Sequence, residues 1–189
     1  MRRLVMKAKK KTSGFVLRRD ERGVAAIEMA FLTPVLLMMF IGAVDLAGVF
    51  SADKKITQAT NTIADLITQA GSKIHKGDLD GIFNAARPIL DPLPESKFGI
   101  RIIGLTPSAA GGNPQKSWEY TKGGMTCSVK NYLQKAKPLM SSGNDIIVAV
   151  GCIYARPLIR TFLTRKGLTL RSEMFLRPRQ SDELKCTDC

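Results

Sequence analysis

Apolar residues follow three successive patterns along the chain, and each pattern predicts a different element. A nearly uninterrupted apolar run covers residues 24–50, VAAIEMAFLTPVLLMMFIGAVDLAGVF, with Glu28 and Asp45 as its only ionisable groups. Over residues 56–70 the apolar positions recur every three or four places, which is the period of a helix with one buried face. Beyond residue 98 the period becomes two, which is typical of β-strands.

We predict that the first two patterns form one continuous helix from Val24 to Ala70, which ends at Gly71. Its apolar half is long enough to span a bilayer, which takes about 20 residues. At about 1.5 Å per residue the whole helix would be roughly 70 Å long, with half of it in the membrane. Pro34 lies in the membrane half, where it removes one backbone hydrogen bond and is expected to kink the helix.

The rest of the chain predicts helix, strand and turn in a small domain. A short helix is expected over Asp78–Ala86, before a proline-rich stretch ends it. Alternating or continuous apolar runs predict three antiparallel strands, at residues 98–103, 146–155 and 168–176. Glycine and other turn-forming residues predict loops or turns at residues 107–114, 141–144 and 165–167.

These elements give an α+β fold, in which the exposed half of a long N-terminal helix packs on a small antiparallel β-sheet. No internal repeat or long low-complexity segment interrupts their order. We divide the chain into a basic cytoplasmic leader, a transmembrane helix, an amphipathic extension of that helix and an exported α+β domain, at residues 1–23, 24–50, 51–71 and 72–189.

The positive charge of the chain is concentrated ahead of the apolar run. The formal net charge is +13, and residues 1–22 carry nine basic and two acidic side chains. By the positive-inside rule, this excess places the N-terminus in the cytoplasm and exports everything after the membrane helix. A contact of these basic residues with nucleic acid or anionic lipid is a competing interpretation. The topology signal explains the charges more economically, because Phe15 is the only aromatic residue among them, and we expect no nucleic-acid partner.

A cleavable secretory signal peptide is the main alternative to a membrane helix, since it also has a basic start and an apolar core. Such a signal needs small residues at the first and third positions before the cut. A cut after Ala47 would place Asp45 at the third position, and a cut after Ala43 would leave a long apolar stretch behind. The cleavage chemistry therefore favours a retained membrane helix.

The start of the apolar run resembles a known family. The sequence RGVAAIEMAF of residues 22–31, followed by Pro34, is similar to the N-terminus of the TadE/TadG-like pseudopilins of tight-adherence pili. That pattern is a basic stretch, a glycine and then small apolar residues with an acid at the fifth place. A weaker similarity recurs where a strand near Tyr154 is followed by a terminal strand closing on residues 177–179.

The resemblance implies a set of functional residues and partners. In this family a prepilin peptidase cuts after the glycine, which maps the cut to Gly23-Val24 and the acid to Glu28. It also implies a single-pass protein of the bacterial inner membrane, with the N-terminus cytoplasmic and the C-terminal domain periplasmic. The implied partners are the inner membrane, the prepilin peptidase, other pilin or pseudopilin subunits and the pilus assembly machinery.

The two acids of the apolar run call for separate interpretations. An ionised carboxylate in a membrane helix costs roughly 2.5–3.5 kcal/mol, so Glu28 needs a partner or a place at the interface. Cleavage would create a partner, the α-ammonium of Val24 on a neighbouring helix; a position at the headgroups beside Arg22 is the alternative. Asp45 lies about 25 Å further along the helix, where we expect a solvated residue more than an interhelical contact.

All four cysteines fall in the part that is predicted to be exported, at Cys127, Cys152, Cys186 and Cys189. An oxidising periplasm would pair them, and three connectivities are possible. We favour Cys127–Cys152, with Cys186 and Cys189 closing on each other, although the sequence alone does not choose. Zinc binding or thiol exchange at the terminal CxxC is weaker, because no second CxxC is present and the motif does not open a helix.

The sequence offers little for catalysis. Its only histidine, His75, lies in a polar stretch after the long helix, where we expect a solvated surface residue. No Ser/His/Asp arrangement, paired-carboxylate site, phosphate loop or nucleotide motif is found. We therefore expect no enzymatic activity, no cofactor and no metal.

Together these features predict a structural function, that of a minor pilin-like component in the biogenesis of a tight-adherence pilus. The alternative is an assembly factor that keeps its leader and stays anchored in the inner membrane with a periplasmic binding domain. An intact N-terminus in the mature protein would favour the alternative.

Overall fold

The computed structural model describes residues 22–108, 113–140, 143–156 and 167–189. The chain forms two compact units, Met1–Ile41 and Gly42–Cys189. One helix, α1, runs through Arg22–Thr68 and continues through Pro34, close to the predicted bounds. A long N-terminal apolar helix with a small antiparallel sheet confirms the predicted α+β class.

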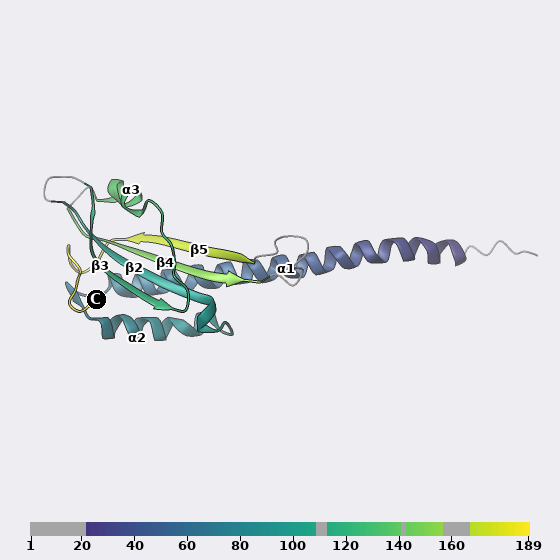
Figure 1. Ribbon diagram of the computed structural model, residues 1–189, viewed down its shortest axis with the longest axis horizontal. Coiled ribbons are helices and arrows are strands. Elements are labelled where there is room, and N and C mark those ends of the chain that lie inside the picture. The colour runs from purple at the N-terminus through teal and green to yellow at the C-terminus, as the bar shows by residue number, and fades with distance from the viewer. Residues whose placement is uncertain (1–21, 109–112, 141–142, 157–166) are drawn as a thin grey trace, which may run out of the picture. The chain divides into compact units, whose positions relative to one another are not determined.

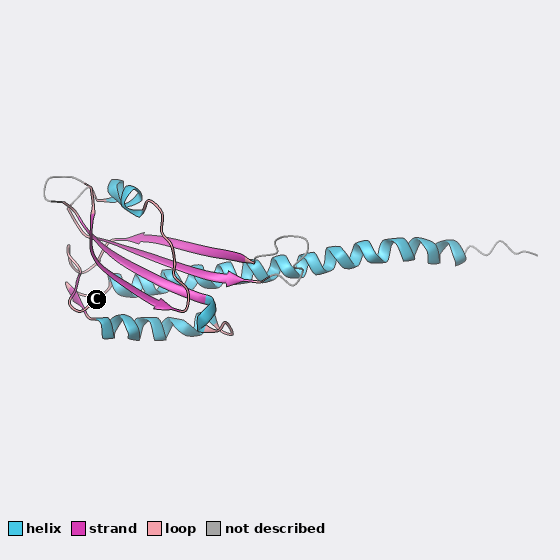
Figure 2. Cartoon of the chain, in the orientation of Figure 1, coloured by secondary structure: helices cyan, strands magenta, loops and turns pink. Residues whose placement is uncertain are grey.

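Four antiparallel strands form the main sheet, in the order β3-β2-β4-β5 (Figures 1 and 2). Their bounds are Phe98–Thr106 for β2, Gln115–Gly123 for β3, Ile146–Ala155 for β4 and Leu168–Leu176 for β5. Strands β2, β4 and β5 lie where the apolar runs predict them. The strand β3 was not predicted, because it is an edge strand whose buried residues are only Trp118 and Tyr120.

Helices cover one face of this sheet. The second half of α1 buries a stripe of apolar side chains against it, at Ile56, Ala59, Ile63 and Ile67. Helix α2, Lys76–Ala86, adds Leu79 and Phe83 to the same core. Figure 1 shows the two helices along one side of the strands, with the short helix α3, Tyr132–Ala136, on the other side.

The opposite face of the sheet has a smaller core of its own. Alternate residues of β4, such as Val148 and Val150, point away from α1 and pack with Ile103 of β2 and Ala136 of α3. Because both faces are covered, β4 is apolar at nearly every position, as a central strand should be. The continuous apolar run therefore predicted both the place and the depth of this strand.

Short elements complete the domain. In the described part of the chain, 3₁₀ helices are at Arg87–Leu90, Glu95–Lys97 and Lys137–Leu139. Two short strands, β1 at Lys73–Ile74 and β6 at Lys185–Cys186, pair in parallel and join the chain after α1 to the C-terminus. The predicted loops at residues 107–114 and 141–144 lie partly outside the described residues, as does the turn at 165–167.

Candidate functional site

The predicted processing residues lie in order at the start of α1. The helix begins at Arg22, so Gly23 and Val24 belong to its first turn and Glu28 follows one turn later. Both Val24 and Glu28 are exposed. A Cβ added at Gly23 would meet no described atom within 4 Å, so packing among the described residues gives no reason for a glycine here.

Among the described residues, none forms a hydrogen bond or ion pair with Glu28. Its carboxylate shares the first part of α1 with exposed apolar side chains such as Ile27 and Phe31. An ionised group in such surroundings needs a partner or water at the membrane surface.

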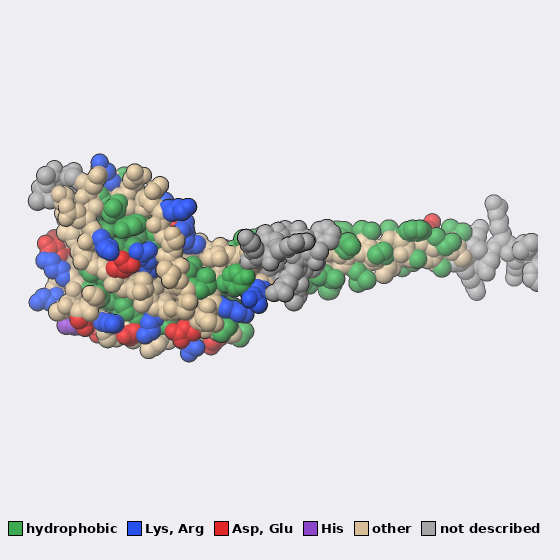
Figure 3. Space-filling view, viewed as in Figure 1, with side chains coloured by type: hydrophobic (Ala, Val, Ile, Leu, Met, Phe, Trp, Pro, Cys, Tyr) green, Lys and Arg blue, Asp and Glu red, His purple; other side chains and the backbone are tan. Residues whose placement is uncertain are grey.

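A continuous apolar surface covers the same part of the helix. Apart from Leu66, Leu139 and Leu168, every exposed large apolar side chain in the described part of the chain lies between Val24 and Phe50. Figure 3 shows these hydrophobic side chains on the N-terminal part of α1. The helix is long and apolar enough to cross a membrane.

A polar side chain inside this apolar segment forms its hydrogen bond within the helix, as the interior of a membrane requires. The hydroxyl of Thr33 donates a hydrogen bond of 2.6 Å to the backbone carbonyl of Met29, so it needs no external partner. Pro34 has no N–H and leaves the carbonyl of Ala30 without its helical donor. The kink at Pro34 stays a prediction.

Asp45 corrects one expectation from the sequence. Its side chain is only 4% exposed, so it is not the solvated residue that we predicted. It lines a pocket together with Leu93 and with Tyr154, at the end of β4. The prediction is wrong because this acid at the end of the apolar run does not face water: this part of α1 has the folded domain beside it.

The C-terminal residues 179–189 form a clasp that ties separate parts of the domain together. The backbone N–H of Arg179 donates to the carbonyl of Thr68 at the end of α1, at 2.8 Å. The N–H of Lys185 donates to Ser72 at 3.0 Å, and the N–H of Thr187 donates to Ile74 at 3.2 Å. The guanidinium of Arg179 also pairs with Asp65 on α1. This clasp holds the end of the long helix to the domain.

Leu184 is the buried centre of the clasp. The indole N–H of Trp118 donates to its carbonyl at 2.8 Å, and its own N–H donates to Asp145 at 2.9 Å. Leu184 is fully buried and Asp145 is 2% exposed. Burial raises the pKa of the Asp145 carboxyl above its usual value, although the hydrogen bond from Leu184 opposes that shift.

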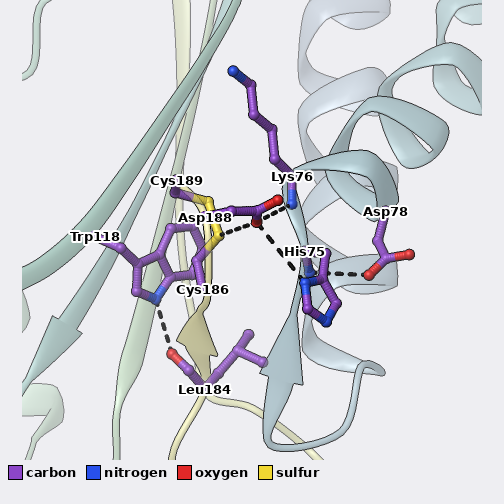
Figure 4. The surroundings of a disulfide bond; sticks show 8 residues. All are labelled: His75, Lys76, Asp78, Trp118, Leu184, Cys186, Asp188 and Cys189. Atoms are coloured by element: carbon purple, nitrogen blue, oxygen red, sulfur yellow. Dashed lines mark hydrogen bonds and ion pairs between the residues drawn. A yellow bond between two sulfur atoms is a disulfide. The ribbon is translucent and has the colours of Figure 1, made fainter.

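Asp188 joins the clasp to the start of α2 (Figure 4). Its carboxylate accepts the backbone N–H of Lys76 at 2.7 Å, and it lies 4.0 Å from Nδ1 of His75. The side chain of His75 is 61% exposed, as the sequence indicates. Asp78 accepts the N–H of His75 at 3.0 Å, so two carboxylates serve the first turn of α2, where the helix dipole favours negative charge.

Another polar network joins α2 to the sheet. The hydroxyl of Tyr120 donates to Asp80 at 2.6 Å, and the ammonium of Lys122 binds the same carboxylate oxygen at 2.7 Å. The hydrogen bond from Lys122, followed by that from Tyr120, lowers the pKa of Asp80. Burial, and then the hydrogen bond that it donates to Asp80, raise the pKa of the Tyr120 hydroxyl. These pKa shifts favour an ionised Asp80, a neutral Tyr120 and a protonated Lys122, the states in which the three side chains hold α2 to the sheet.

The structure contains two disulfides, Cys127–Cys152 and Cys186–Cys189, the pairing that we favoured from the sequence. The first joins the loop after β3 to the central strand β4 and is buried, with both cysteines 2% exposed. The second closes the clasp on itself and is accessible to solvent. Cys186, Asp188 and Cys189 place their ligand atoms within 4.8 Å of one another, but the two sulfurs are bonded to each other and are not thiolate ligands.

Exposure predicts the order in which the disulfides are reduced. With a mild phosphine reductant under native conditions, Cys186 and Cys189 should react with an alkylating reagent well before Cys127 and Cys152, because a reductant must reach a sulfur to attack it. Mass-spectrometric mapping of the labelled cysteines checks this order. Before reduction all four cysteines should resist alkylation. Equal labelling of both pairs would contradict the different burial of the two bonds.

Comparison with known proteins identifies the N-terminal part of the chain. The geometry defines a class of protein in which a small disulfide-bonded α+β domain is carried on a long apolar N-terminal helix. Residues 23–65 match the family model for TadE-like protein, which confirms the resemblance over nearly all of α1. No curated protein and no solved structure gives a significant match. The TadE-like match suggests involvement in tight-adherence pilus assembly.

Proposed function

We propose that the protein is a minor pilin-like structural subunit of a tight-adherence pilus, processed by a prepilin peptidase between Gly23 and Val24. The observation that carries this proposal is the apolar face of α1 in a TadE-like segment, with Glu28 exposed and without a partner among the described residues. Such a surface requires lipid or other helices around it. A subunit that moves from the membrane into a filament meets both.

In the proposed arrangement the basic residues before α1 stay in the cytoplasm and residues 51–189 lie in the periplasm of a bacterial cell. The net positive charge ahead of the helix supports that orientation. The disulfides support it too, because disulfides persist in an oxidising compartment. The fold would then present the sheet and the clasp outside the cytoplasm.

We propose a structural role and not catalysis. The polar groups that the fold brings together, such as Asp80 with Tyr120 and Lys122, join one element to another. The pair of Arg101 and Glu119 does the same between β2 and β3, at 2.7 Å. In each of these networks the charged and polar groups pair with one another, which makes the domain more rigid.

Processing is tested by the N-terminus of the mature protein. In a strain with a working prepilin peptidase, N-terminal sequencing of the membrane fraction should give Val24 as the first residue. The variant Gly23→Leu should remain full-length, because a bulky side chain at the cut hinders the backbone from entering the protease site. Gly42→Leu is the matched control in the same helix and should be cut normally, since a Cβ there meets nothing within 4 Å.

A mature N-terminus that is still Met1 would reject the processed-subunit proposal. It would favour the uncleaved assembly factor, which keeps the basic leader and remains in the inner membrane. Cleavage of Gly23→Leu at the normal rate would place the processing site elsewhere in the chain.

A further inference from the structure

A pocket of about 350 Å³ lies beside α1 within the second unit of the chain. Its lining includes apolar side chains such as Val44, Val49 and Leu93. It also includes charges of both signs, from Asp45, Lys97 and Arg156. The volume lies at the lower end of the range for small-molecule sites, which is about 300–1,000 Å³. The size and the mixed lining fit a small ligand that is itself both charged and apolar.

The charged groups of the pocket differ in depth. Asp45 is 4% exposed, Lys97 is half-buried and Arg156 is exposed. The guanidinium of Arg156 lies 5.5 Å from the centre of the Tyr154 ring, which keeps it near the pocket. The negative group is therefore deep and the positive groups are closer to the opening.

The place of the pocket along the helix indicates what surrounds it. Asp45 lies 21 residues after Val24 on one uninterrupted helix, a distance of about 30 Å at the usual helical rise. The hydrocarbon core of a bilayer is also about 30 Å thick. If the apolar run spans the membrane, the residues around Asp45 lie at the level of the phospholipid headgroups of the far leaflet.

We propose that this pocket binds the headgroup of a phospholipid that carries a primary ammonium, of the phosphatidylethanolamine type. The phosphate binds Lys97 and Arg156, and the ammonium reaches the deeper carboxylate of Asp45. Asp45 already interacts within the chain, and the ammonium adds to that interaction. The glycerol and the first acyl carbons leave the pocket past Val44, which lies on the membrane side of Asp45 and is 44% exposed. The inference goes beyond the pilus role and rests only on the membrane span.

Native mass spectrometry of the full-length protein, released from nanodiscs, tests the proposal. The nanodiscs contain equal amounts of phosphatidylethanolamine, phosphatidylcholine and phosphatidylglycerol with the same acyl chains. The wild-type protein should retain phosphatidylethanolamine over phosphatidylcholine by about fivefold, because a trimethylated ammonium cannot donate hydrogen bonds to Asp45. Phosphatidylglycerol should be retained less than phosphatidylethanolamine, because it lacks the ammonium.

Two sets of variants separate the two ends of the headgroup. Lys97→Gln combined with Arg156→Gln should lower phosphatidylethanolamine retention about tenfold, the effect of a lost charge-assisted hydrogen bond. Asp45→Asn should abolish the preference over phosphatidylcholine while phosphate-dependent retention persists. The matched control, Lys130→Gln with Lys137→Gln, changes the charge equally at two exposed residues that flank α3 and should change nothing.

Equal retention of the three lipids by the wild-type protein would overturn the proposal. So would a preference for phosphatidylglycerol that Asp45→Asn leaves unchanged, since that result indicates simple attraction of basic groups. If Asp45→Asn does not fold, the wild-type lipid preference and the Lys97, Arg156 double variant decide the matter. Failure of the wild-type protein to insert into nanodiscs would refute the membrane span as well as the lipid site. Insertion without a lipid preference would refute the lipid site alone.

Discussion

Replacing Glu28 with leucine should leave cleavage at Gly23-Val24 intact and abolish pilus formation. Leucine removes the cost of a charge in an apolar helix, roughly 2.5–3.5 kcal/mol, so membrane insertion should become easier and not harder. Loss of pili would then report a lost contact between subunits. The measurement is N-terminal sequencing of the membrane-bound protein together with electron microscopy of surface pili.

A matched control for this prediction is available on the same helix. Thr33→Val also replaces a polar group with an apolar one, but the hydroxyl of Thr33 only bonds back to the carbonyl of Met29. Pili should therefore form normally with Thr33→Val. Glu28→Asp keeps the charge and should retain part of the piliation. Normal pili with Glu28→Leu would show that this carboxylate has no role in assembly.

The second large effect concerns the contact of α1 with the sheet. At Gly151 in β4, an added Cβ would lie 2.0 Å from the hydroxyl oxygen of Thr60 and 2.9 Å from a methyl carbon of Ile56. Both of these side chains are fully buried, so they have no space into which to move. We expect Gly151→Ala to lower the free energy of unfolding by about 2–3 kcal/mol through overpacking.

Gly81 provides the control for Gly151. It lies inside helix α2, and a Cβ there would meet nothing within 4 Å. Gly81→Ala should raise the free energy of unfolding by about 0.5–1 kcal/mol, because alanine loses less backbone freedom in a helix. Urea unfolding of the detergent-solubilised protein, followed by the fluorescence of Trp118, the only tryptophan, measures both changes. A neutral Gly151→Ala would mean that α1 and β4 are further apart than the structure places them.

The sequence alone does not predict why glycines occur at certain positions of this sheet, because each one leaves space for a side chain from a distant part of the chain. Gly104 makes room for the indole of Trp118, which approaches to 2.2 Å of where a Cβ would be. That indole binds Leu184, which lies 66 residues later in the chain. A glycine in a strand has no apolar pattern of its own, and only the partner strand and the helix above it reveal what the missing side chain allows.

By itself, the sequence determined the parts of the fold that depend on local periodicity. The long apolar and amphipathic runs gave helix α1 almost to its ends, and the run at residues 146–155 gave the central strand, because burial on both faces requires apolar residues throughout. The TadE-like N-terminal motif could also be recognised from the sequence, because its glycine, small residues and acid lie close together in the chain.

Only the tertiary structure decided which distant residues meet. The edge strand β3 buries too few residues to show a pattern, and two-residue strands such as β6 have no period at all. The sequence predicts a solvated Asp45 because its place along the helix is near the outer membrane–water boundary, yet residues of β4 more than 100 positions later line its pocket. Contacts between segments far apart in the chain determine the burial of Asp45, the clasp around Leu184 and the packing of Gly151 against Thr60. Such contacts leave no local periodicity in the sequence.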